Sequence, residues 1–238
     1  MTTILTIAEL SLAATTLARA LTACHAEYAI IGGAGVALHA QRFNLTAHPT
    51  ADIDAIIQPN PARGINADSI SRTLRTEFPD QFTSVSQYGV SLPAILLQRG
   101  DQPLVVEIEL FDVETWPGRP QYDLSRASNA RRAVQVGGQT VHVMSVAWLL
   151  REKIVTQAQR EGSKKEASDI LDITCLATIA SDRELDCETE EFVRALRRLL
   201  EKRPELEESL RRVVKYTNDF ERVAECGFAK TKSFKTGQ

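Results

Sequence analysis

The stretch PTADID, residues 49–54, places Asp52 and Asp54 two positions apart, directly before the apolar residues 55–57. In a β-strand, residues i and i+2 point to the same face, so the two carboxylates would stand side by side. Carboxylates on a buried strand are costly to leave without a partner. Hard oxygen ligands at this spacing suit Mg²⁺, which prefers a few carboxylates plus phosphate oxygens. The spacing therefore predicts a divalent-metal site, with a solvated acidic edge of a sheet as the alternative.

A glycine pair, Gly32 and Gly33, lies upstream, between the apolar run at 28–31 and a helical pattern at 34–41. Glycines let the backbone pass close to a ligand. The start of a helix offers N–H groups and a partial positive charge, which suit a phosphate. An ordinary tight turn between strand and helix is the alternative reading of so short a motif.

A third candidate lies in the stretch LVVEIELFD, residues 104–112, where acidic and apolar residues alternate. As a strand, this stretch would place Glu107 and Glu109 on one face and apolar side chains on the other. One of the two glutamates could complete a cluster of three carboxylates. An outward-facing polar surface of the sheet is the alternative, and it is common.

Taken together, these features describe a phosphate cradle beside a two-metal site. Two metal ions about 4 Å apart can activate an attacking oxygen and stabilise a leaving pyrophosphate. Carboxylates that bridge both ions would explain why Asp52 and Asp54 stand so close together.

The run IIGGAGVALHAQRF followed by PTADIDAII resembles the nucleotidyltransferase superfamily with the polymerase-β-type fold. That resemblance implies that Gly32 and Gly33 hold the triphosphate of an NTP and that Asp52 and Asp54 hold the metals. Two further positions fall on the threonine and arginine of the family pattern, namely Thr50 and Arg42. The segment between these two residues is longer than in the family, which puts the role of the arginine in question.

The third acid is chosen by the same resemblance. Related small members carry a strand acid followed, several residues later, by an aromatic residue, proline and glycine. Here the sequence Trp-Pro-Gly at 116–118 favours Glu109, with Glu107 as the fallback. The family more often has aspartate at this place, and glutamate keeps the charge while reaching further.

The run VMSVAWLLREKIVTQAQREGSKKEASDILDI resembles the second half of bacterial abortive-infection-type transferases. Lys153 falls on the same helical stripe as Val146 and would bury its stem there. Its ammonium group would need a charged or hydrogen-bonding partner, because a buried charge is costly without one. A nucleotide phosphate is one candidate, and an ion pair with Asp169 or Asp172 is the other.

Composition bounds the class of protein. The chain has 238 residues, 43% hydrophobic and 25% charged, with a net charge of −3, which gives no global attraction to nucleic acid. Its four cysteines lack the spacing of a zinc site, so we expect free thiols in a reducing compartment. No signal peptide and no membrane span are expected, which predicts a cytoplasmic protein.

Periodicity and turn residues predict an α/β (α+β) fold, a mixed sheet with flanking helices followed by a helical subdomain. The expected units are a catalytic domain at 1–143, a helical subdomain at 144–228 and a mobile basic tail at 229–238. Helices are predicted at 7–26, 34–41, 67–77, 145–159, 165–180, 188–201 and 205–216. Strands are predicted at 28–31, 52–57, 82–87, 94–98, 103–111 and 140–143, and the segment with Arg126, Arg131 and Arg132 is predicted to be a loop.

The resemblance implies a Mg²⁺-dependent enzyme that moves a nucleoside monophosphate from an NTP to an acceptor hydroxyl and releases pyrophosphate. Two Mg²⁺ ions would be the cofactor, with Mn²⁺ as a substitute. The acceptor would be a small molecule before RNA or protein. Two alternatives remain at this point: a non-catalytic nucleotide-binding or regulatory module with the same fold, and a nucleotidyltransferase toxin acting on tRNA.

Overall fold

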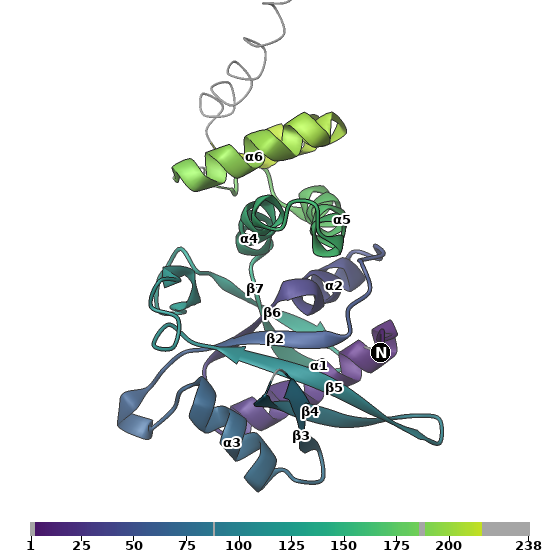
Figure 1. Ribbon diagram of the computed structural model, residues 1–238, viewed down its shortest axis with the longest axis vertical. Helices are drawn as coiled ribbons and strands as arrows, with labels where there is room; N and C mark the ends of the chain where they lie inside the picture. The colour runs from purple at the N-terminus through teal and green to yellow at the C-terminus, as the bar shows by residue number, and fades with distance from the viewer. Residues whose placement is uncertain (1–2, 88, 186–188, 216–238) are drawn as a thin grey trace, which may run out of the picture. The chain divides into compact units, whose positions relative to one another are not determined.

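The computed structural model describes residues 3–215 apart from 88 and 186–188, and it divides the chain into two units, Met1–Ser145 and Val146–Gln238 (Figure 1). The boundary follows Ser145, where the sequence analysis placed it after residue 143. The expected basic tail at 229–238 and the end of the helix expected at 205–216 lie outside the described residues.

A seven-stranded mixed sheet in the order β3-β4-β5-β2-β1-β7-β6 forms the first unit. β2 lies parallel to β5, and β1 lies parallel to β7, while the remaining neighbours are antiparallel. The strands are β1 (Tyr28–Ile31), β2 (Asp52–Ile57), β3 (Phe82–Gln87), β4 (Val90–Arg99), β5 (Gln102–Phe111), β6 (Arg131–Val136) and β7 (Gln139–Met144).

Helices cover both faces of this sheet. α2 (Gly32–Arg42) lies on one face, while α1 (Ile7–Ala23) and α3 (Ala67–Glu77) lie on the other, as Figure 1 shows. Both α1 and α3 begin with a capping box, formed by Thr6 with Glu9 in α1 and by Asn66 with Ser69 in α3. The mixed α/β fold predicted from the sequence is confirmed.

The strand β6 corrects one prediction, because Arg131 and Arg132 belong to it and not to a loop. It forms a hairpin with β7 across Gly137 and Gly138, both with positive φ, 54° and 78°. Two glycines between alternating residues are a strong hairpin signal, since a two-residue turn of this type needs positive φ at both central positions. The strand was missed because β6 begins with two arginines and, as an edge strand, lacks a clear apolar pattern.

The second unit is helical, with α4 packed against both α5 and α6. Its elements are α4 (Val146–Gln159), α5 (Lys164–Ile179), α6 (Glu190–Lys202) and α7 (Glu207–Val213). Buried apolar residues fill its interior, including Leu149, Ile173 and Leu196. Across the described part of both units, no helix has the length and apolar character needed to cross a membrane.

Candidate active site

The register between β2 and β5 brings four carboxylates to one face of the sheet. Asp52 lies opposite Glu107, and Asp54 lies opposite Glu109. All four are partly buried, whereas their neighbours Ile53 and Val106, which point to the other face, are fully buried. Because adjacent strands lie roughly 4.8 Å apart, each aspartate stands beside the glutamate of the next strand. The alternation predicted from sequence is therefore the alternation that the structure has.

The donor chemistry of this face fits Mg²⁺, because carboxylate oxygens on a half-buried surface are hard ligands. The side chains are not gathered into a ready ligand set. Within residues 3–215 as described, no group of three His, Cys, Asp or Glu side chains is arranged to hold a metal ion. The assignment of Asp52, Asp54 and Glu109 as metal ligands stays a prediction, and it requires their carboxylates to rotate toward one another.

Gly32, the first residue of α2, makes room for one of these carboxylates. Its φ of +63° lies in the left-handed region, which favours glycine. A Cβ at this position would lie 2.2 Å from Oδ2 of Asp54, far inside van der Waals contact. The sequence analysis assigned the glycine pair to a phosphate, and the structure gives the first glycine a second reason, the close approach of Asp54.

Gly33 has a similar relation to Thr50, whose Oγ1 would lie 3.2 Å from an added Cβ. The Thr50 hydroxyl donates a hydrogen bond of 2.9 Å to Oδ1 of Asp52. Its carbonyl accepts a hydrogen bond of 2.9 Å from the N–H of Leu5. Thr50 thus orients the first aspartate, a contact that its assignment to nucleotide binding did not include.

The start of α2 faces this group of residues. Its N-cap residue, Ile31, provides no side-chain hydrogen bond, and its first turn carries no acidic side chain. Helix N-terminal N–H groups and the positive end of the helix dipole favour an anion. The local chemistry suits a phosphate, and the assignment of Gly32 and Gly33 to triphosphate binding stays a prediction.

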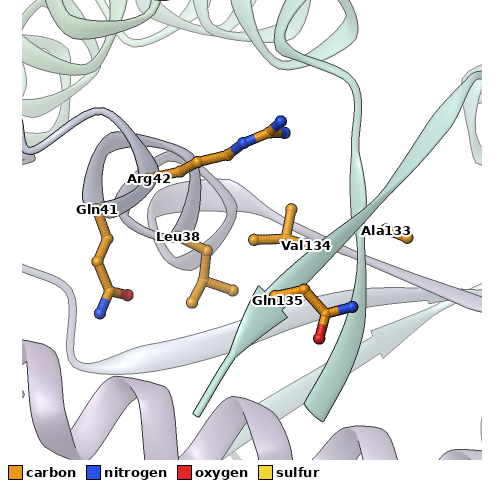
Figure 2. Close-up of a pocket in the computed structure, with 6 residues that line it drawn as sticks. All are labelled: Leu38, Gln41, Arg42, Ala133, Val134 and Gln135. Carbon is orange, nitrogen blue, oxygen red and sulfur yellow. The ribbon is translucent and has the colours of Figure 1, made fainter. Parts of the chain in front are cut away.

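Arg42 lies at the opposite end of α2, roughly 15 Å from Gly32 at 1.5 Å per helical residue. Its guanidinium lies 5.8 Å from the ring centroid of Phe43. A cavity of about 380 Å³ opens beside it, and Figure 2 shows α2 on one side and β6 on the other. The residues that line this cavity are Leu38, Gln41, Arg42, Ala133, Val134 and Gln135. Arg42 thus lies at the end of α2 away from Gly32, which adjoins Asp54, and its role stays open.

Asp112 is a residue that the sequence analysis missed. It follows β5 directly and is 1% exposed. Its Oδ2 accepts a hydrogen bond of 2.7 Å from the N–H of Ala67 at the start of α3, and its Oδ1 accepts one of 2.6 Å from the N–H of Thr115. The sequence signal that could have found it is local: an aspartate at the end of a strand, directly before turn residues, often accepts a hydrogen bond from a backbone N–H a few residues later, here that of Thr115.

Lys153 lies in the second unit and binds both candidate aspartates of α5. Its Nζ is 2.8 Å from Oδ1 of Asp169 and 2.7 Å from Oδ2 of Asp172, and each aspartate is 1% exposed. Burial lowers the pKa of Lys153, but the charges and hydrogen bonds of the two aspartates outweigh it and raise that pKa. The ion-pair alternative is present in the structure, and a role in nucleotide binding stays a prediction.

Two comparisons with known proteins match most of the chain. A family model described as "Nucleotidyl transferase AbiEii toxin, Type IV TA system" matches residues 18–233. The crystal structure of an antigenic nucleotidyltransferase-like protein from Paracoccidioides brasiliensis is similar, with 37% identity and a TM-score of 0.82, over 92% of this chain and 100% of that one.

More distant comparisons add little. The solution structure of the antibiotic-resistance factor ANT(2'')-Ia is 14% identical over 84% of this chain and 95% of that one, with a TM-score of 0.41. A TM-score this low does not establish a shared fold. None of the curated proteins matches the chain.

Proposed function

The chain belongs to the AbiEii nucleotidyltransferase family, and we propose that it moves a nucleoside monophosphate from an NTP to an acceptor hydroxyl. The acceptor oxygen attacks the α-phosphorus, the bridging bond to the β-phosphate breaks, and pyrophosphate leaves. The observation that carries this proposal is the register of β2 and β5, which sets Asp54 beside Glu109 on a face that adjoins the start of α2.

Asp52, Asp54 and Glu109 are the proposed ligands of two Mg²⁺ ions, for which Mn²⁺ could substitute. When bound, the ions would supply charge stabilisation to the attacking and leaving oxygens. Glu109 is also the proposed acceptor of the hydroxyl proton. Glu107, opposite Asp52, is the alternative for either task because it shares the same face.

The start of α2 is the proposed site of the triphosphate. Because Gly33 has no side chain, a phosphate could approach its backbone closely, except on the side where Thr50 lies. The N-terminus of the helix also favours negative charge. Thr50 holds Asp52 through its hydroxyl, so its contribution is to orient a ligand of the metal and not only to contact the nucleotide. Lys153 is the further candidate for a phosphate contact, in competition with its ion pairs.

The acceptor is proposed to be a small molecule, because a net charge of −3 gives no general attraction to RNA. A second candidate is a toxin that modifies tRNA, and the description of the matching family as a toxin favours it. A third reading, a regulatory module without turnover, predicts binding alone.

One experiment separates these readings. The protein is incubated with each labelled NTP and Mg²⁺, with small hydroxyl acceptors or with total tRNA, and pyrophosphate release is followed together with the intact mass of the products. Release that depends on a small acceptor supports the leading proposal, and release that depends on tRNA supports the toxin. NTP binding without release under every condition would favour the regulatory module over these two transferase readings.

A further inference from the structure

An aromatic cluster stands at the carboxyl end of β5, on the side of the proposed active site. It is built around Phe111, whose ring centroid lies 6.2 Å from that of Trp116 and 5.5 Å from that of Tyr122. The tyrosine is buried, but the indole of Trp116 is 46% exposed. A large aromatic side chain is thus packed on one side and open to solvent on the other.

Hydrogen bonds fix the loop that presents this indole. The N–H of Trp116 donates to the carbonyl of Asp112 at 3.0 Å, and the N–H of Arg119 donates to the carbonyl of Trp116 at 2.9 Å. The buried carboxylate of Asp112 holds both Thr115 and the start of α3. The exposure of Trp116 is therefore a property of an ordered turn, and a ligand that stacked on it would pay little ordering cost.

The register places the cluster beside the carboxylates. Along β5, Glu109 and Phe111 share one face because side chains alternate. Phe111 lies opposite Ile56, two residues beyond the pair of Asp54 and Glu109. Two residues of a parallel strand span roughly 6.6 Å, so the aromatic cluster begins about one sugar ring away from the proposed site of phosphoryl chemistry.

We propose that Trp116, backed by Phe111, is a stacking surface for a nucleobase. This proposal rests on the proposed function, because it is the reacting phosphate between Asp54 and Glu109 that would set a base at this distance. Every base has a flat π-face, so stacking tolerates all four bases. The base belongs either to the NTP or to an RNA acceptor, since both would end at the same carboxylates.

Stacking of one base on an aromatic side chain changes affinity by roughly 5- to 150-fold. Trp116→Leu should therefore weaken binding of the base-bearing substrate by that factor and leave the melting temperature nearly unchanged. Trp116→Phe keeps a π-face and should retain most of the affinity. Phe43→Leu is the matched control, because Phe43 is also about half exposed, at 49%, but lies at the far end of α2.

Binding is read without turnover by equilibrium dialysis of labelled ligand, because Trp116→Phe and Trp116→Leu remove the tryptophan whose emission would report it. The four NTPs and a short single-stranded oligoribonucleotide are dialysed in EDTA against the wild type, Trp116→Phe, Trp116→Leu and Phe43→Leu. Saturable binding is expected in the wild type, in Trp116→Phe and in Phe43→Leu, and weaker binding is expected in Trp116→Leu. Tryptophan emission is a second readout in the two proteins that keep Trp116, since the other tryptophan, Trp148, is only 4% exposed.

The two ligand arms identify the source of the base. If Trp116→Leu weakens binding of the NTPs alone, the surface belongs to the donor nucleotide, and if it weakens binding of the oligoribonucleotide alone, the surface belongs to an RNA acceptor. Equal affinity of the wild type and Trp116→Leu for both ligands would overturn the proposal. Binding that Trp116→Leu weakens, together with no pyrophosphate release in the separate Mg²⁺ assay, would count against the transferase and keep the stacking surface. Turnover in the Mg²⁺ assay with KM values unchanged in Trp116→Leu would keep the transferase and overturn the stacking surface.

Discussion

Two clusters of acidic side chains, one in each unit, are handled in different ways. In the second unit, Asp169 and Asp172 are almost fully buried, and the chain supplies their cation, because Lys153 binds both. In the first unit, Asp54 and Glu109 stand in register on a face that is only partly buried. Lys153 stabilises the buried pair, and the pair in register on the partly buried face is the one proposed to bind Mg²⁺.

The local geometry around each cluster points the same way. Lys153 lies within hydrogen-bonding distance of both α5 carboxylates, so the positive charge is fixed in place when the unit folds. Around Asp54, by contrast, it is the backbone that gives way, since Gly32 has no side chain where Oδ2 of this aspartate lies. A glycine at such a close approach is common where the backbone forms part of a binding site.

The largest effect is expected from Asp54→Asn. Loss of one member of an essential catalytic group should lower kcat by about 10⁴-fold or more. The free energy of unfolding should stay the same or rise, because one negative charge leaves the face shared with Glu109. Pyrophosphate release and thermal melting measure the two quantities. Asp101→Asn, at an exposed turn, is the matched control, and wild-type turnover in Asp54→Asn would refute the mechanism.

Lys153→Ala tests the other half of the comparison. If Lys153 is structural, its removal leaves two buried carboxylates without their cation, and the free energy of unfolding should fall by about 3–5 kcal/mol. NTP affinity in the folded fraction would then change little. If it binds phosphate, stability should stay nearly normal and NTP affinity should fall by roughly 10- to 150-fold.

Melting of the nucleotide-free protein and NTP titration on this variant decide between the two roles. Lys165→Ala is the control, because Lys165 is an exposed lysine of α5, the helix that also carries Asp169. The ion pairs seen in the structure favour the first outcome. A stable Lys153→Ala protein with weak NTP binding would return this residue to the active site.

Gly32→Ala sharpens the distinction between backbone strain and site geometry. Gly64 provides the comparison, because its φ of +65° nearly equals the +63° of Gly32, yet nothing lies within 4 Å of a Cβ added there. Both alanine variants should lose about 1–2 kcal/mol of stability from the left-handed backbone. Only Gly32→Ala should also displace Asp54 and so lower turnover and Mn²⁺ affinity. Equal activity of the two variants would contradict a role of Gly32 at the site.

Much of the secondary structure could be predicted from the sequence, because a local pattern of apolar and turn residues sets the bounds of these elements. The strands at 28–31 and 52–57 and the helix at 67–77 begin and end where their patterns predicted. Alternation also fixed that Glu107 and Glu109 share one face, whereas the choice of Glu109 came from the family resemblance, and only the structure gives the register that sets it opposite Asp54.

Other features depend on contacts that the sequence does not encode locally. The hydrogen bond between Thr50 and Asp52, the fit of Asp54 against Gly32, and the anchoring of α3 by Asp112 all arise from where elements meet in space. The two partners of Lys153 were both named in advance, but only packing of α4 against α5 could show that it binds both at once.

The smallest effect is expected at a pair near the surface, between an exposed arginine and a partly buried glutamate, which completes the contrast with the buried ion pairs of Lys153. The guanidinium of Arg99 donates to both carboxylate oxygens of Glu9, at 2.6 and 2.7 Å. This hydrogen bonding, with that of Thr6, lowers the pKa of Glu9 from 4.5 to about 2. Because the pKa is lowered by folding, the contribution of the pair is present above pH 4.5 and is lost as the pH falls towards 2.

Glu9→Gln should therefore be less stable than the wild type at neutral pH, and the difference should shrink between pH 4.5 and 2. The difference should be small and should decrease further in 0.5 M salt, at roughly the ionic strength where exposed pairs are strongly screened. Urea unfolding across this pH range measures it, with Glu114→Gln, an exposed glutamate, as the control. A difference that persists at pH 2, or that salt leaves unchanged, would contradict a charge effect between Glu9 and Arg99, because glutamine can still accept the capping hydrogen bond from the N–H of Thr6.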